Sequence, residues 1–243
     1  MLFHGLTNCP QQFEAFAQLL HARGENVYVP RLPYHGYADR MTAAIGKITV
    51  ADIQGAAADA ARLGQGLGAH VNAHGLSLGG TMALWLAQTG GVDNAVGLAP
   101  FLMVPFIPRA PGMLLMHALH ALPDRFMWWD PRRRERMVPL YAYPGFWTHC
   151  LAQCVFSGAS IFAAAGRTAP SVPRCTIAIN AQDPAVNNGA ARALAARWGD
   201  RGGQYRLESW NDLGRVHDVI DSSTYPAAVG LVYPRLIALL TSS

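Results

Sequence analysis

A serine flanked by two glycines constrains the fold of this chain more than any other feature. In the segment HGLSLGG, Ser77 lies between Gly75 and Gly79, after a short apolar stretch at 69–74 and before a helix-like stretch at 77–88. On a tight strand-to-helix turn the serine adopts an unfavourable backbone conformation. Side chains two residues before and after it would collide, so both positions require glycine. The segment predicts a strand–turn–helix unit that exposes the Ser77 hydroxyl at the positive end of the helix.

Strand-like and helix-like segments alternate on both sides of this turn. The expected strands are 1–4, 26–32, 69–74, 94–99, 175–180 and 205–210, and the expected helices are 10–22, 49–62, 77–88, 187–198 and 226–240. This alternation predicts an α/β fold, with a mostly parallel sheet and helices on both faces. Residues 101–170 break the pattern, because they are rich in proline and aromatic residues and contain no clean strand. We therefore assign 1–100 and 171–243 to one core and 101–170 to an insertion.

A nucleophilic serine needs N–H donors to stabilise the negative charge of a tetrahedral intermediate. The backbone N–H of Leu78, directly after the serine, is one expected donor. The stretch from Leu2 to Thr7 indicates an apolar strand, a His-Gly pair and a turn into a helix. We assign the second donor to the backbone N–H of Leu6, where Gly5 would let a substrate approach closely, with Thr7 as the weaker candidate. A simple strand-to-helix turn is the alternative.

The serine also needs a general base, and histidine has a suitable pKa near neutral pH. His217 is the best candidate, because it follows the last expected strand and precedes the final helix. The other histidines lie on strands, helices, an earlier loop or the insertion, where three of them could line a pocket: His4, His21, His35, His70, His74, His117, His120 and His149. The alternative for His217 is a surface loop residue without a catalytic role.

A carboxylate is expected to hold the base in the correct tautomer. Asp183 follows the strand before that of His217, which gives the chain order Ser, Asp, His that is typical of α/β hydrolases. Asp212, Asp218 and Asp221 compete for this role. We expect Asp218 and Asp221 to stabilise the first turn of the final helix instead, since they lie too close to the histidine in sequence.

With these residues in place, the chain resembles the α/β-hydrolase superfamily, and within it the bacterial carboxylesterase and monoacylglycerol-lipase branch. The matching segments are FHGLT at 3–7, PRLPYHG at 30–36, GLSLG at 75–79, QDPAV at 182–186, and His217. The resemblance implies a small-molecule ester substrate with a short to medium acyl chain, cleaved through an acyl-enzyme on Ser77. It implies no metal and no organic cofactor.

In that family an insertion at this position is a lid, which the resemblance implies for residues 101–170. The segment is apolar enough to accommodate an acyl chain. The expected pocket residues are Phe101, Met103, Phe106, Trp128 and Trp129. Each of them could instead pack the lid onto the core.

Composition narrows the set of partners. A net charge of +4 with only 14% charged residues is far from the profile of a nucleic-acid-binding protein. The arginine run at 132–134 and 136 is interpreted as a solvated turn, with an anion or membrane-surface patch as the alternative. The four cysteines match no zinc pattern. The most apolar stretch, 101–122, is broken by prolines and Arg109, so no stable membrane insertion is expected.

The start of the chain departs from the family, whose members usually have strands before the His-Gly strand. Met1 leaves no room for a secretory signal, which predicts a cytoplasmic location. A shortened sheet and a missing N-terminal segment are both open explanations, and the second would hide a signal peptide. An exposed sheet edge would favour pairing of chains into a homo-oligomer.

Two other functions are open at this point. The same three residues could cleave an amide or a carbon–carbon bond, since fold analogy does not fix the substrate. A non-catalytic binding module on this fold is the third hypothesis, against which the intact set of Ser77, Asp183 and His217 argues.

Overall fold

Five parallel strands form the centre of the protein. The computed structural model describes residues 1–241, with strands β1 (Leu2–Phe3), β2 (Asn72–Leu76), β3 (Asn94–Leu98), β6 (Arg174–Asn180) and β7 (Arg206–Trp210) in the order β1-β2-β3-β6-β7. Leu76 pairs with Leu98, and Leu98 with Ala178, so the carboxyl ends of these strands lie along one edge. The predicted mostly parallel α/β fold is confirmed.

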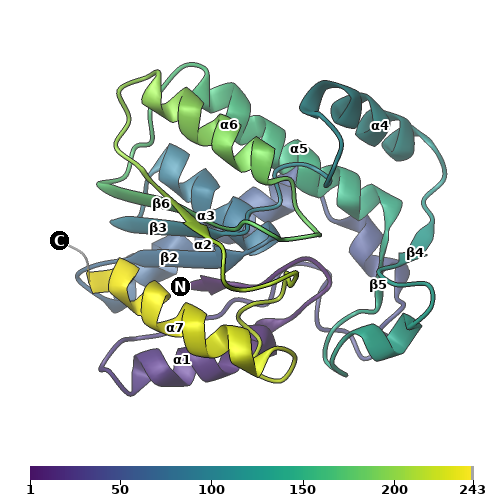
Figure 1. Ribbon diagram of the computed structural model, residues 1–243, viewed down its shortest axis with the longest axis horizontal. Coiled ribbons are helices and arrows are strands. Elements are labelled where there is room, and N and C mark those ends of the chain that lie inside the picture. The colour runs from purple at the N-terminus through teal and green to yellow at the C-terminus, as the bar shows by residue number, and fades with distance from the viewer. Residues whose placement is uncertain (242–243) are drawn as a thin grey trace.

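Helices cover both faces of the sheet (Figure 1). They are α1 (Glu14–His21), α2 (Val50–Leu67), α3 (Leu78–Thr89), α4 (Arg109–Ala121), α5 (Thr148–Ala165), α6 (Asn188–Gly199) and α7 (Pro226–Thr241), with short 3-10 turns at Pro10–Phe13, Ala43–Lys47 and Arg134–Met137. In Figure 1, α1 and α7 lie together on one face, while α5 and α6 lie on the other. Thr49 and Asp52 form a capping box at the start of α2, which continues to Leu67 rather than ending near residue 62 as expected.

The expected strand at 26–32 is wrong. This segment runs beside β1 and accepts one hydrogen bond, from the N–H of Leu2 to the carbonyl of Tyr28 at 3.0 Å. Pro30 has no N–H to donate, and the N–H of Leu32 is donated to the ring of His4 at 3.2 Å. The ladder therefore ends after a single contact, because a side chain takes the donor that a strand would need.

The predicted insertion contains more regular structure than expected. A short antiparallel pair, β4 (Phe126–Trp128) and β5 (Gly145–Trp147), corrects the expectation of no strand between residues 101 and 170. The last helix of this segment, α5, packs against α2, α3 and α6 as well as α4. It therefore belongs to the layer of helices on the sheet, while α4 and the β4–β5 pair lie to one side of that layer (Figure 1).

By length and composition, helix α5 could span a membrane, but 56% of its 18-residue window is buried within the protein. Its buried residues include Cys150, Cys154 and Phe162. Packing against three core helices explains this apolar composition, as expected for a helix that is enclosed on several sides.

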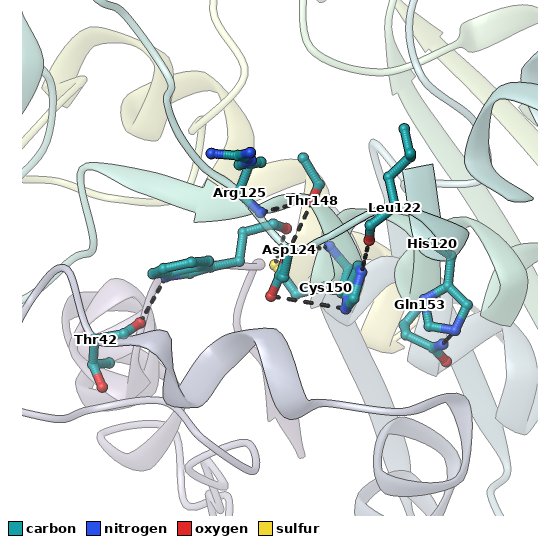
Figure 2. Close-up of polar contacts among 10 residues, drawn as sticks. Thr42, His120, Leu122, Asp124, Arg125, Thr148, Cys150 and Gln153 are labelled. Carbon is teal, nitrogen blue, oxygen red and sulfur yellow. Dashed lines mark hydrogen bonds and ion pairs between the residues drawn. The ribbon is translucent and has the colours of Figure 1, made fainter. Parts of the chain in front are cut away.

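One carboxylate joins the loop after α4 to the start of α5 (Figure 2). Asp124 Oδ1 accepts hydrogen bonds from the Thr148 hydroxyl at 3.0 Å and from the backbone N–H of His149 at 2.9 Å. These are first-turn groups of α5, whose N–H donors have no partners within the helix. Asp124 therefore caps the helix from outside its own sequence, and its negative charge lies at the positive end of the helix dipole.

We expect Asp124→Ala to lower the free energy of unfolding by about 1–2 kcal/mol, as for the loss of a helix cap. Urea denaturation measures this difference. Asp59→Ala is the matched control, because the exposed carboxylate of Asp59 pairs with the guanidinium of Arg62, and such surface pairs contribute little. Equal stability of the two variants would contradict a capping role for Asp124.

Candidate active site

Ser77 sits on a sharply strained turn between β2 and α3. Its backbone has φ 59° and ψ −115°, an uncommon conformation for any residue other than glycine. A Cβ on Gly75 would overlap the carbonyl of Gly79, and a Cβ on Gly79 would overlap the carbonyl of Phe3. Glycine is therefore required at both positions, as expected from the sequence. At Gly79 the steric restriction comes from β1.

Backbone bonds hold this turn in place while its hydroxyl is left free. The N–H of Ser77 is donated to Leu98 at 3.0 Å, and its carbonyl accepts from Thr81 at 2.9 Å and Phe101 at 3.0 Å. Within residues 1–241, the Ser77 hydroxyl has no hydrogen-bond partner. Such strain, in a residue whose side chain is not used for structure, is typical of functional positions.

The two expected oxyanion donors are also free. Neither Leu6 nor Leu78 donates its backbone N–H to another group of the described chain. The N–H of Thr7, in contrast, is donated to His35 Nε2 at 3.3 Å. A Cβ on Gly5 would lie 3.6 Å from the Cβ of Ser77, so this loop borders the serine. The N–H of Leu6 therefore stays the candidate donor, because that of Thr7 already has an acceptor.

Two buried histidines shape the loop that carries Leu6. His4 donates from Nδ1 to the carbonyl of Gly5 at 2.9 Å, and His35 donates from Nδ1 to Pro33 at 2.8 Å. Their Nε2 atoms are acceptors, so both rings are neutral. Burial lowers the pKa of His4 to about 3 and that of His35 to about 4. Neither role follows from the sequence, because each depends on partners about thirty residues away.

His217 and Asp183 are hydrogen-bonded to each other. His217 Nδ1 donates to Asp183 Oδ2 at 2.7 Å, and the N–H of Ala185 is donated to Asp183 Oδ1 at 2.8 Å. Asn180 donates to the carbonyls of Gly214 and Val216, which fixes the loop before the histidine. The proton on Nδ1 leaves Nε2 as an acceptor. Nε2 has no partner among the described residues, and no hydrogen bond joins it to Ser77.

The pKa of His217 is raised above its usual value. Partial burial alone would lower it, but the charge and hydrogen bond of Asp183, together with the charge of Asp218, outweigh that effect. The imidazolium is therefore stabilised, as a base that accepts a proton requires.

The competing carboxylates have other partners. Asp212 pairs with Arg235 at the surface. Asp221 precedes α7 and accepts from the N–H of Ser223 at 2.9 Å and from the hydroxyl of Tyr141. The expectation that Asp218 and Asp221 stabilise the first turn of α7 is wrong, because Asp218 accepts from Gln12 at 3.0 Å and the partners of the Asp221 carboxylate lie outside that helix. Asp183 is the acid that contacts His217.

The sequence profile of the alpha/beta hydrolase family matches residues 1–229. The chain belongs to this family. No curated protein matches the sequence. Among solved structures, this alpha/beta hydrolase is similar to one described with the metagenome-derived lipolytic enzymes LipS and LipT, at TM-score 0.74 and 20% identity over 100% of this chain and 92% of the other.

Two monoacylglycerol lipases are also similar to this hydrolase in structure. The Paleococcus ferrophilus enzyme has TM-score 0.72 and 17% identity over 100% of this chain and 93% of the other. A soluble variant of the Saccharomyces cerevisiae monoglyceride lipase has TM-score 0.75 and 12% identity over 99% and 85%. At such identities the likeness shows the fold alone.

The five expected pocket residues differ in burial and in partners in this hydrolase. Phe101 and Met103 are buried in the core, while Phe106 is 85% exposed. Trp128 packs against the ring of Phe126, and Trp129 donates to the Thr7 hydroxyl at 2.8 Å. Phe106 alone of the five lines a hollow of about 430 Å³ beside Asp183.

The insertion histidines, which could have lined a pocket, lie instead around the junction of α4 and α5. His117 and His120 pack against the ring of Phe156. His149 contacts Asp124 and donates to the carbonyl of Leu122 at 2.8 Å. Their hydrogen bonds and ring contacts join two helices, so they contribute to the packing of this region.

Proposed function

We propose that this alpha/beta hydrolase cleaves carboxylic esters of short to medium acyl chain length through an acyl-enzyme on Ser77. One observation carries the proposal. Ser77, which has a strained backbone and a free hydroxyl, lies at the same edge of the sheet as His217, whose Nδ1 is hydrogen-bonded to the buried carboxylate of Asp183 at 2.7 Å. Nucleophile, base and orienting acid are the three roles that serine-based acyl transfer requires.

The reaction proceeds in two steps. Ser77 Oγ attacks the acyl carbonyl while His217 Nε2 accepts the hydroxyl proton, and Asp183 stabilises the imidazolium. The N–H groups of Leu6 and Leu78 stabilise the oxyanion. His217 then protonates the leaving alcohol, and the ester bond breaks. A water molecule, deprotonated by the same nitrogen, releases the acid and restores Ser77.

The part of the insertion that we propose as the lid is the segment 104–147, without α5. This segment contacts the oxyanion loop directly, since the N–H of Tyr143 is donated to the carbonyl of Thr7 at 2.7 Å. Trp129 binds the hydroxyl of the same residue. The hollow lined by Phe106, Ile107 and Val186 is apolar on these sides and of a size that suits a small ligand. We propose it as space for part of the substrate.

We expect kcat/KM to fall as the pH is lowered through the pKa of His217, because the base must be neutral to accept a proton. Since that pKa is raised, the midpoint of the acid limb is expected above 6.5. A raised pKa in the folded state also stabilises the fold below 6.5, and this contribution is lost as the pH rises through the folded-state value. Ester hydrolysis from pH 4 to 9 measures the first effect, and a flat profile down to pH 4 would contradict a histidine base.

A substrate panel tests the proposed reaction against its alternatives. Rates are measured for p-nitrophenyl esters with acyl chains of two to sixteen carbons, for the p-nitroanilides of the same acids and for β-diketones. Each substrate is tested with the wild type and with the Ser77→Ala variant. We expect serine-dependent turnover of esters with an optimum in the shorter half of the series. Turnover confined to amides or diketones would replace the ester assignment, and no turnover of any class would favour a binding module.

A further inference from the structure

A glutamine links the loop that carries Leu6 to the loop that carries His217. Gln12 Oε1 accepts from the backbone N–H of Gly5 at 2.8 Å, and Gln12 Nε2 donates to Asp218 Oδ1 at 3.0 Å. Asn8 donates to the other oxygen of Asp218 at 3.4 Å. The side chain of Gln12 thus joins Gly5 to Asp218, which lies 206 positions after Gln12 in the sequence.

The orientation of this amide has a single solution. The N–H of Gly5 can only donate, so it requires the oxygen of Gln12. The carboxylate of Asp218 can only accept, so it requires the nitrogen. Gln12 is 4% exposed. A reversed amide would place its nitrogen against the N–H of Gly5, donor against donor, and its oxygen against the carboxylate of Asp218, acceptor against acceptor. Asp218 therefore determines which end of Gln12 meets the peptide next to Leu6.

Asp218 lies among other ionisable groups. Burial and the charge of Asp221 raise the pKa of Asp218 to about 6, while the charge of His217 opposes the shift. Besides burial, the charge of Asp218 also contributes to raising the pKa of Tyr141, from the insertion, and that of Tyr233 on α7. At pH 8 the carboxylate is ionised, and the donors of Gln12 and Asn8 meet it.

We propose that Gln12 and Asp218 are positioning residues: they hold the N–H of Gly5, and with it the peptide that follows, so that the N–H of Leu6 points at the oxyanion. The inference rests on the proposed function, because it presupposes acyl transfer at Ser77. Neither side chain contacts the reacting atoms. Their effect passes through a backbone donor whose placement changes the energy of the transition state more than that of the bound ester.

A donor–acceptor exchange between the two side chains tests this pair. In Gln12→Glu, a second carboxylate lies against that of Asp218. In Asp218→Asn, the new amide nitrogen lies against the amide nitrogen of Gln12 or of Asn8. The double variant restores complementarity, since the glutamate accepts from both Gly5 and the asparagine. Asp212→Asn is the matched control, because this carboxylate on the same loop pairs with Arg235 at the surface. Gln12→Ala serves if Gln12→Glu does not fold, as judged by thermal unfolding.

At pH 8 with a p-nitrophenyl ester, we expect Gln12→Glu or Gln12→Ala to lower kcat by about ten- to a hundredfold with little change in KM, less than the full loss of an oxyanion donor. The double variant is expected to recover to within about threefold of the wild type, which non-interacting sites would not produce. Folded variants with unchanged kcat, or a folded double variant no better than the poorer single one, would overturn the proposal. Absence of ester turnover in the wild type would instead refute the proposed function.

Discussion

Ser77→Ala is expected to lower kcat for ester hydrolysis by about 10⁵-fold or more, in line with the removal of other serine nucleophiles. Without the hydroxyl no acyl-enzyme forms, and the remaining groups can only assist a poorly placed water. The fold should persist, because the hydroxyl makes no hydrogen bond within residues 1–241 and the strained turn is held by its backbone. Steady-state rates on a p-nitrophenyl ester, with thermal unfolding beside them, measure both effects.

The control for this variant is Ser222→Ala. Ser222 is exposed and lies on the loop after His217, so its loss changes the same region of the surface without removing the proposed nucleophile. We expect its rate to equal that of the wild type. A Ser77→Ala enzyme that keeps a tenth of the wild-type rate would assign the chemistry to another group.

Asp183→Asn is expected to lower kcat by about 10⁴-fold, and the geometry gives a specific reason. The N–H of Ala185 is donated to Asp183 Oδ1, so an asparagine places its oxygen there and its nitrogen towards His217. Nδ1 must then accept, and the ring proton moves to Nε2. Nε2 of His217 would then carry a proton and could not accept the proton of the Ser77 hydroxyl.

Rates with Asp212→Asn provide the comparison for Asp183→Asn, since the same chemical change is made at a surface ion pair. Proton exchange on the imidazole can be followed by NMR, which should report the Nδ1-protonated form in the wild type and the Nε2-protonated form in Asp183→Asn. A loss of less than tenfold, with the tautomer unchanged, would mean that this carboxylate does not orient the base.

The features that could be predicted from the sequence depend on local geometry. Gly75 and Gly79 are needed by the turn itself, and Thr49 and Asp52 cap a helix within four residues. Asp183 and His217 follow from the order of strands in a parallel sheet, because residues after adjacent strands meet at one edge. These inferences require only the alternation of strands and helices.

The features that could not be predicted depend on distant partners. The role of Asp218 is set by Gln12, and the loss of regular pairing at 26–32 is set by the ring of His4. Neither contact has a periodic signal in the sequence. The core position of α5 was obscured for a similar reason, since its apolar composition suits a lid, a membrane span or a buried helix, and only its packing against α2, α3 and α6 distinguishes them.

The most direct test of the site is covalent labelling by a fluorophosphonate at pH 8, followed by mass spectrometry of the digested protein. Such a probe reacts with a serine hydroxyl that is activated by a base and faces oxyanion donors. We expect one label per chain, on the peptide that contains Ser77, with labelling lost in Ser77→Ala and much slower in Asp183→Asn. No label on a folded wild-type protein, or a label on a different serine, would contradict the assignment of Ser77, Asp183 and His217 as one catalytic unit.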